Sequence, residues 1–227
     1  MEFNELHSWN LTPREAVALQ RELAEQVTLQ ERLPPVVRTL AGVDVSYEKH
    51  GREFFAGVVL LAFPGLEPIA WASARGQVDF PYIPGLLSFR ELPVVLEAFR
   101  QLRDAPDLVM VDGQGIAHPR RLGIASHLGL WIELPTIGCA KSRLCGVHDE
   151  VGLEKGARAP LSDRGEVIGR VLRSRTGVKP LYVSPGYAIG VDRAAQWVLH
   201  SCRRYRMPEP TRQAHLFTNR LRGAARE

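Results

Sequence analysis

The sequence predicts an α/β fold in which helices cover both faces of one mixed sheet. Three extended stretches joined by short turns come first, and such short connections favour antiparallel pairing. A short, fully apolar stretch, Leu108–Val111, is typical of strands that are covered on both faces. Around and after it, helical and extended stretches alternate, as in parallel β-α-β units. A chain of 227 residues, 45% of them hydrophobic, is therefore expected to form one domain over residues 1–227.

The first element is predicted to be a helix. Thr12-Pro13-Arg14-Glu15 has the pattern of a capping box with proline at the first helical position. Apolar residues then recur at helical spacing: Ala16, Leu19, Leu23 and Val27. Pro34-Pro35 is expected to end this helix.

The three extended stretches cover about residues 38–47, 54–63 and 67–75. His50-Gly51 and Pro64-Gly65 are turn signals between them. These stretches are therefore expected to form an antiparallel meander, followed by parallel strands.

The rest of the chain is predicted to alternate helices and strands. Ser88 to Glu91 opens a helix whose apolar residues form one stripe. The later elements are expected as a strand at 108–111, a helix near 120–130, strands near 135–140, 166–173 and 179–184, an amphipathic helix at 191–202 and a last helix at 211–222. The stretch 146–164 is polar and aperiodic, so it is expected to be a loop or an insertion. This element order is similar to that of the ribonuclease H-like fold, in which the first strand can lie beside the fourth.

Charge and cysteine content narrow the class of protein. The net charge is +4, and six arginines but only one acid, Glu209, lie between residues 203 and 222. A basic face suits a phosphate backbone, although a solvated pair of arginine-rich helices gives the same pattern. Three cysteines without a C-x-x-C pair argue against a disulfide framework or a structural zinc site. Because no signal segment or membrane-spanning apolar run is visible, a cytoplasmic protein without membrane association is expected.

Two aspartates are candidates for chemistry at the ends of strands. Asp44 lies in an apolar stretch, where a carboxylate is costly unless it is compensated, although strand alternation alone could place it in water beside Ser46. Asp112 directly follows the strand 108–111, and ligand sites in α/β sheets gather at the carboxyl ends of strands. A simple Asp-Gly turn is the alternative there. If the first strand lies beside the fourth, the two aspartates come together.

Glu91 and Lys141 complete a candidate metal centre. Glu91 borders the apolar stripe of its helix and could join the aspartates, or it could close a capping box with Ser88. Three carboxylates suit Mg²⁺, with Mn²⁺ as a substitute, and such an ion activates water for phosphodiester hydrolysis. Lys141 ends a strand where an ammonium could stabilise a charged transition state, or could simply lie in water.

The segment Pro81-Tyr82-Ile83-Pro84 is unusual because two prolines stiffen it and exclude regular structure. It would hold Tyr82 and Ile83 on a rigid tip. Proteins insert rigid apolar or aromatic tips of this kind between stacked bases. A proline-locked loop that packs on the core is the alternative.

Four segments together resemble the endonuclease V family, and they occur in that family's order: Gly42–Tyr47, Pro81–Glu91, Asp112–Arg120 and Gly138–Ser142. The resemblance runs from about residue 12 to about residue 222. The tyrosine-containing block followed by Asp-Gly-x-Gly-x-x-His is highly specific. The resemblance therefore implies a deoxyinosine 3′ endonuclease.

The resemblance also implies a role for each matching residue. The metal-binding acids would be Asp44, Glu91 and Asp112, and the catalytic lysine would be Lys141. The wedge that separates the strands would be Pro81, Tyr82, Ile83 and Pro84. The lesion pocket would be formed by Gly85, Leu87, Gly113, His118 and Ile124. His215 would be a further metal ligand, although its polar helix face, shared with Arg212 and Asn219, also suits exposure to solvent.

The reaction that the resemblance implies is a DNA repair step that depends on Mg²⁺. A monomer would hydrolyse the second phosphodiester bond 3′ to deoxyinosine after flipping the altered nucleotide out of the stack, without removing the base. Inosine in RNA is an alternative substrate. Two competing hypotheses are another structure-specific nuclease of the ribonuclease H-like fold and a nucleic-acid-binding protein without catalytic activity.

Overall fold

The structure, a computed structural model, describes residues 1–48 and 51–225. In chain order its elements are α1 (Pro13–Glu25), β1 (Thr39–Tyr47), β2 (Glu53–Ala62), β3 (Pro68–Gln77), α2 (Leu87–Arg100), β4 (Leu108–Val111), α3 (Ile124–Ile132), β5 (Thr136–Ala140), β6 (Arg158–Asp163), β7 (Glu166–Leu172), β8 (Leu181–Tyr187), α4 (Val191–His200) and α5 (Glu209–Ala224).

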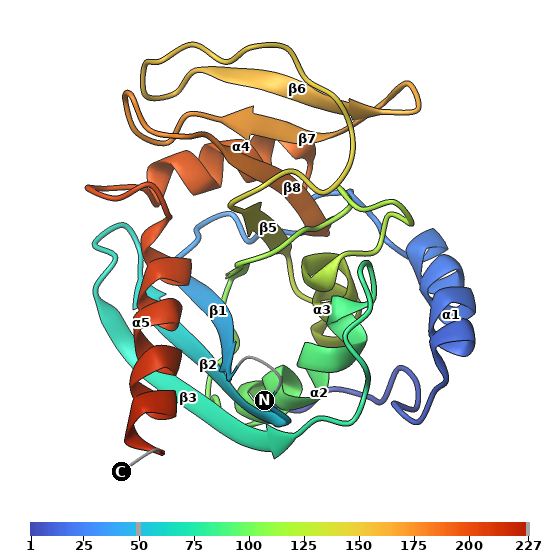
Figure 1. The fold of residues 1–227 in the computed structure, drawn as a ribbon. Coiled ribbons are helices and arrows are strands. Elements are labelled where there is room, and N and C mark those ends of the chain that lie inside the picture. The colour runs from blue at the N-terminus through green and yellow to red at the C-terminus, as the bar shows by residue number, and fades with distance from the viewer. Residues whose placement is uncertain (49–50, 226–227) are drawn as a thin grey trace.

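The strands form one eight-stranded mixed sheet in the order β3-β2-β1-β4-β5-β8-β7-β6 (Figure 1). β1, β2 and β3 make the predicted antiparallel meander. β4 pairs in parallel with β1 and with β5, so the expected contact between the first and fourth strands is confirmed. β8, β7 and β6 then extend the sheet as antiparallel strands. The expectation that parallel strands follow the meander is therefore confirmed for β4 and β5 but is wrong for the later strands. The two turn signals in the meander are His50-Gly51 and Pro64-Gly65, and His50 lies outside the described residues.

Helices cover both faces of this sheet, as the sequence predicts. On one face, α2 and α3 pack on alternate residues of the central strands, among them Val43 and Val109. On the other face, α4 and α5 pack on the intervening residues, among them Leu40 and Met110. β4 is buried over its whole length, which explains why its sequence is continuously apolar.

The first helix is shorter than the sequence predicts. The capping box of Thr12 with Glu15 is confirmed, but α1 ends at Glu25, well before Pro34-Pro35. The backbone N–H of Ala188 donates to the carbonyl of Thr28 at 2.7 Å, and the N–H of Arg32 donates to the carbonyl of Ala188 at 3.0 Å. The chain leaves the helix because its backbone bonds to a segment that is distant in sequence.

The stretch 146–164, expected to be a loop or an insertion, is irregular only in part. Residues 158–163 form β6, which pairs with β7 at the edge of the sheet. Val147 makes an isolated bridge to Ser162. The polar composition that predicted a loop reflects an edge strand with alternately exposed residues. Within the described residues, every helix is too short or too polar to span a bilayer.

α5 lies unusually close to β1. A Cβ atom added at Gly42 would lie 1.8 Å from the carbonyl oxygen of Pro210, at the start of α5. Only glycine allows the helix to approach the strand at this point. This close contact fixes α5, and with it His215, against the middle of β1.

We expect the change Gly42→Ala to lower the free energy of unfolding by about 1–3 kcal/mol, because the new methyl group meets backbone that cannot yield. Urea denaturation followed by circular dichroism measures this loss. Gly223→Ala is the matched control, since a Cβ atom at Gly223 in α5 meets open space. A Gly42→Ala protein as stable as the control would contradict the close packing of α5 on β1.

Candidate active site

Three carboxylates from different elements meet at the centre of the sheet. β1 and β4 are in register at Val43 and Val111, so Asp44 and Asp112 come next to each other. The backbone N–H of Asp112 donates to the carbonyl of Val43 at 3.3 Å. Glu91, in the second turn of α2, lines the same cavity as both aspartates. The structure therefore brings the three acids that the sequence singled out to one cavity. Asp44 and Asp112 are close enough to share an ion with His215, whereas Glu91 lies outside that group.

Side chains of α5 hold Asp44 in place. The hydroxyl of the buried Thr218 donates to Oδ2 of Asp44 at 2.8 Å, and Nδ1 of His215 lies 3.2 Å from the same oxygen. The amide of Asn219 lies 3.0 Å from Nε2 of His215 and orients the ring. His215 thus contacts the acid cluster, although half of its side chain is exposed. Sequence reasoning missed Thr218, whose signal is its position one turn after His215 on the same face.

The donor set fits a divalent cation. Potential ligand atoms of Asp44, Asp112 and His215 all lie within 4.8 Å of one another. Burial, together with the charges of Asp44 and Asp112, raises the pKa of Glu91 to about 8. Burial also raises the pKa of Asp44. Carboxylates crowded in this way repel one another, and a bound cation such as Mg²⁺ or Mn²⁺ would offset that repulsion.

The alternative role of Glu91 as a helix cap is wrong. α2 begins at Leu87, its N-cap residue is Leu86, and within the described residues no side-chain hydrogen bond caps this end. The Ser88 hydroxyl bonds instead to Nδ1 of His127 at 3.0 Å, inside the protein. Because helix α2 starts before Ser88, both Ser88 and Glu91 are turned inward, which leaves Glu91 beside the aspartates.

Lys141 lies directly after β5, and its ammonium forms an ion pair with Oδ2 of Asp112. Its side chain remains 46% exposed, whereas that of Asp112 is 14% exposed. A cation that is paired with a buried acid and still open to solvent can reach a bound substrate. The alternative of a lysine that lies only in water does not describe this residue.

The loop of residues 80–86 presents one aromatic ring to solvent. Tyr82 is 67% exposed, while Phe80 and Ile83 pack against a buried cluster that contains Leu86 and Phe89. The apolar side chains on both sides of Tyr82 therefore anchor the loop. The alternative of a loop packed on the core describes Ile83 but not Tyr82.

The carbonyl of Gly85 is held by three donors. Gln20 donates to it at 3.0 Å, Nη2 of Arg120 at 2.8 Å, and Nε2 of His118 at 3.1 Å. Nδ1 of His118 accepts from the backbone N–H of Arg120, so Nε2 carries the proton. Burial lowers the pKa of His118 to about 4, and the ring is neutral at physiological pH. His118 therefore acts on the pocket by fixing Gly85.

Gln20 and Arg120 hold the candidate pocket through Gly85, and sequence reasoning missed both of them. Gln20 is buried on the inward side of α1 and also donates to the carbonyl of Leu122 at 2.8 Å. A polar residue within an otherwise apolar stripe was the available signal. Arg120 also donates to the side-chain oxygen of Gln20. The two side chains join α1 to the loop that carries Tyr82.

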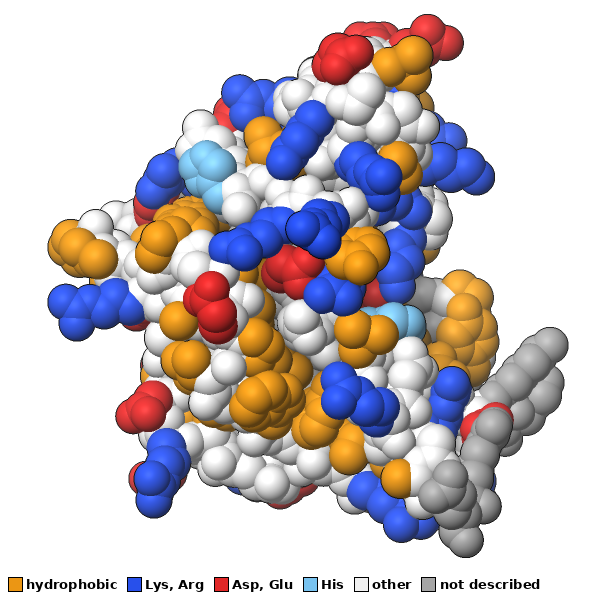
Figure 2. Space-filling model, turned by 90° about the vertical axis from the view of Figure 1, so that its left-hand side faces the viewer, with side chains coloured by type: hydrophobic (Ala, Val, Ile, Leu, Met, Phe, Trp, Pro, Cys, Tyr) orange, Lys and Arg blue, Asp and Glu red, His pale blue; other side chains and the backbone are white. Residues whose placement is uncertain are grey.

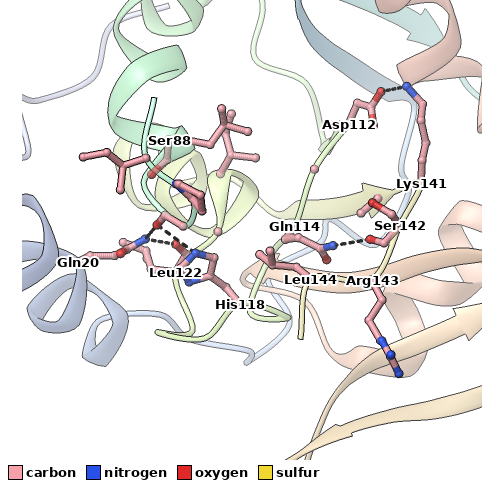
Figure 3. A pocket seen from close by; sticks show the side chains of 18 of the residues that line it. Gln20, Ser88, Asp112, Gln114, His118, Leu122, Lys141, Ser142, Arg143 and Leu144 are labelled. Atoms are coloured by element: carbon pink, nitrogen blue, oxygen red, sulfur yellow. Dashed lines mark hydrogen bonds and ion pairs between the residues drawn. The ribbon is translucent and has the colours of Figure 1, made fainter. Parts of the chain in front are cut away.

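A pocket of about 430 Å³ lies between this loop and the acids (Figure 3). All five residues expected to form it are in its lining: Gly85, Leu87, Gly113, His118 and Ile124. Tyr82, Asp112 and Lys141 also line it, so the pocket reaches the acid cluster. Its mixture of backbone groups and apolar side chains suits a flat heterocycle.

The arginine-rich segment is only partly free for a ligand. Figure 2 shows lysine and arginine side chains scattered over one face of the molecule, among acidic and hydrophobic ones. Several of these arginines bond within the protein. Arg206 donates to the carbonyl of Lys141, Arg212 to the carboxylate of Glu209, and Arg222 to the carbonyl of Tyr47. The segment 203–222 therefore has a structural role as well as a positive potential.

Comparisons with known proteins agree on one family. Residues 21–216 match the family model described as Endonuclease V. The Endonuclease V of Gloeobacter violaceus is 54% identical over 222 residues, which cover 96% of this chain and 90% of that protein. The Streptomyces avermitilis Endonuclease V structure superposes with a TM-score of 0.91 at 42% identity and covers 97% of both chains.

A third relative has been solved with nucleic acid. It is a variant of Ciona intestinalis Endonuclease V in complex with a 23mer DNA that contains an inosine followed by a ribo-adenosine. It superposes with a TM-score of 0.82 at 26% identity and covers 93% of this chain and 98% of that chain.

We expect the change Glu91→Gln to stabilise the metal-free protein at alkaline pH. Because burial raises the folded-state pKa of Glu91 from its ordinary value of 4.5 to about 8, the folded protein holds a proton that the unfolded chain releases. Stability is therefore lost as pH rises through this window, and glutamine removes that loss. The gain at about pH 8.5 should exceed about 1 kcal/mol and should shrink toward about pH 5.

Urea denaturation in the presence of a chelator measures this gain. Glu97→Gln is the control, because Glu97 is an exposed acid on the same helix. Equal effects of the two substitutions at every pH would show that Glu91 does not carry a raised pKa.

Proposed function

Because this chain belongs to the endonuclease V family, we propose that it cuts DNA at the second phosphodiester bond 3′ to a deaminated adenine, with Mg²⁺ as its metal ion. That the chain is a nuclease follows from the family itself. One observation carries the more specific proposal: an open pocket of a size that suits a heterocycle reaches the acid cluster and shares Asp112 and Lys141 with it.

The pocket and the exposed tyrosine together suit a flipped nucleotide. Extruding a base costs a few kcal/mol, and the cost is lower for a mispaired base such as hypoxanthine. Tyr82 stands 67% exposed at the rim, where its ring can fill the space that the base leaves. The relative solved with inosine-containing DNA supports inosine as the altered nucleotide.

The pocket can hold hypoxanthine firmly because its own walls are fixed. A Cβ atom added at Gly113 would lie 2.5 Å from Cγ2 of Ile124, so these residues pack closely at one wall. The three donors to the Gly85 carbonyl hold the opposite wall. Backbone groups of such walls would form hydrogen bonds with the edge of the base. A rigid site rejects a different base because the polar groups of the site would then stay unpaired.

Asp44, Asp112, Glu91 and His215 are the residues that would hold the metal ion. When bound, Mg²⁺ would polarise the scissile phosphate and supply a more acidic water. Thr218 and His215 keep the Asp44 carboxylate oriented, and burial keeps water away from Glu91. The ammonium of Lys141, which is paired with Asp112, would stabilise negative charge on the phosphate oxygens.

The arrangement of pocket and acids supports the proposed position of the cut. The base would enter the pocket lined by the loop of residues 80–86, whereas Asp44 and Glu91 line a neighbouring cavity that meets the pocket at Asp112. A strand that places its base in the pocket would therefore present a phosphate further along to the acids. This separation supports cleavage beside the lesion without removal of the base.

We expect the protein to nick a duplex with a single inosine in the presence of Mg²⁺ or Mn²⁺, and to leave matched undamaged DNA intact. Asp112→Asn should lower the nicking rate by about 100-fold or more while binding persists, because it removes a metal ligand and the partner of Lys141. Gel assays on DNA and RNA with and without metal measure this.

Asp104→Asn, at an exposed loop position, is the control for that variant. Equal cutting of plain flaps or junctions would favour a structure-specific nuclease instead. A wild-type protein that binds but never nicks would favour a non-catalytic binding protein.

We expect Tyr82→Ala to weaken binding of inosine-containing duplex by about 10-fold, since stacking of an aromatic ring on a base contributes about 1–3 kcal/mol. Fluorescence anisotropy in the presence of a chelator, which removes the metal ion that cutting requires, measures the affinity. Trp71→Ala is the matched control, because Trp71 is an exposed aromatic residue on the distant edge strand β3. If both variants bind alike, Tyr82 does not act as a wedge.

A further inference from the structure

The guanidinium of Arg206 joins two carbonyl groups beside the candidate catalytic lysine. Its Nη2 donates to the carbonyl of Lys141 at 2.7 Å and to the carbonyl of Pro180 at 2.7 Å. We propose that Arg206 is a positioning residue that fixes the backbone of Lys141 and thereby aims its ammonium at the scissile phosphate. This inference rests on the proposed function, because Arg206 can have this role only if Lys141 takes part in the proposed reaction.

The two carbonyls lie just beyond the end of the pairing between β5 and β8. β5 and β8 pair as antiparallel strands, and Ala140 with Tyr182 is the pair nearest this end. Beyond it the backbone of Lys141 has no partner strand within the described pairing, so its carbonyl needs another donor. Arg206 supplies that donor and links the ends of both strands with one planar group.

Arg206 is itself held in place. It lies in the segment between α4 and α5, and its carbonyl accepts from the hydroxyl of Ser174 at 2.6 Å. The thiol of Cys202 lies 3.6 Å from the same oxygen. The guanidinium therefore extends from a fixed backbone, which is what a positioning group needs.

A second side chain holds the next residue from the other side. The amide of Gln114 donates to the carbonyl of Ser142 at 3.0 Å, and the ammonium of Lys141 pairs with Asp112 (Figure 3). Consecutive carbonyls, those of Lys141 and Ser142, thus receive hydrogen bonds from Arg206 and Gln114. The backbone at the end of β5 is held from two directions.

Fixing this backbone matters because the lysine side chain is long and 46% exposed. A free lysine side chain populates many rotamers, and ordering it costs about 1.5–2 kcal/mol. A shift of about 1 Å in a group that contacts the reacting atoms can lower a rate by about 100-fold. Loss of Arg206 would let the whole end of β5 move, so the ammonium would sample positions away from the phosphate.

The experiment compares two arginines of one segment. Arg206→Ala should lower the single-turnover nicking rate of inosine duplex by about 10-fold or more, while the dissociation constant changes by less than about 3-fold. Arg203→Ala removes the same charge and the hydrogen bond to the carbonyl of Gly65, far from the acids, and should leave the rate within about 3-fold. Arg206→Lys, which keeps the charge and one donor group, should restore part of the rate.

A double-mutant cycle with Lys141→Ala separates positioning from general damage. If Arg206 acts through Lys141, then Arg206→Ala should change the rate by less than about 2-fold in the Lys141→Ala protein. A full additional loss in that background, or equal rates for Arg206→Ala and Arg203→Ala, would overturn the proposal.

The design remains decisive if a variant or the proposed function fails. Should Arg206→Ala not fold, Arg206→Lys is measured against Arg203→Lys, and equal rates again overturn the inference. A wild-type protein that does not nick inosine duplex contradicts the proposed function. A wild-type protein that nicks, is slowed by Lys141→Ala and is unaffected by Arg206→Ala contradicts only the positioning role.

Discussion

The parallel pairing of β1 with β4 is the constraint on which the active site depends. It puts Asp44 and Asp112 side by side, and α2 adds Glu91 to the same cavity. Burial and mutual repulsion raise the pKa of Glu91, so the carboxylate cluster costs folding free energy when no cation is bound. Thr218, His215 and Lys141 offset part of that repulsion through hydrogen bonds and an ion pair. A bound divalent cation would offset the repulsion that remains between the carboxylates. The fold can therefore hold this cluster.

The recognition pocket is rigid for a different reason. The carbonyl of Gly85 lies in one wall of the pocket, here called its roof. The donors to that oxygen come from α1 and from the loop after β4. Gln20 ties α1, which lies at the periphery of the sheet in Figure 1, to the pocket. Because His118 is neutral and both of its ring nitrogens are bonded, the roof does not depend on a titration near physiological pH. α1 thus helps to hold the pocket that would bind the base, although this helix lies at the periphery.

Sequence reasoning succeeds here where the signal is local. Turn residues predict the meander, and continuous apolarity predicts β4. Two of the acids stand out because Asp44 lies within an apolar stretch and Asp112 directly follows an apolar strand. It fails where a distant partner decides the outcome. α1 ends at Glu25 because Thr28 bonds to Ala188, and Ser88 does not cap α2 because the helix begins earlier and the hydroxyl bonds to His127. β6 was missed because an edge strand is polar on its exposed side. Thr218 and Gln20 stand out only weakly in the sequence, because their roles depend on contacts with Asp44 and Gly85, which are distant along the chain.

Pocket and acid cluster share the pair formed by Asp112 and Lys141. Asp112 belongs to the carboxylate cluster and also lines the pocket. Lys141, directly after β5, lies beside the carboxylates and also lines the pocket. Both residues stand at the ends of adjacent parallel strands, which are the most deeply buried strands of the sheet. Any displacement of a base in the pocket would therefore press on the same backbone that places the catalytic groups. The hydrogen bonds of Arg206 and Gln114 to the backbone after β5 would resist that displacement, so the occupied pocket and the acids would keep their spacing.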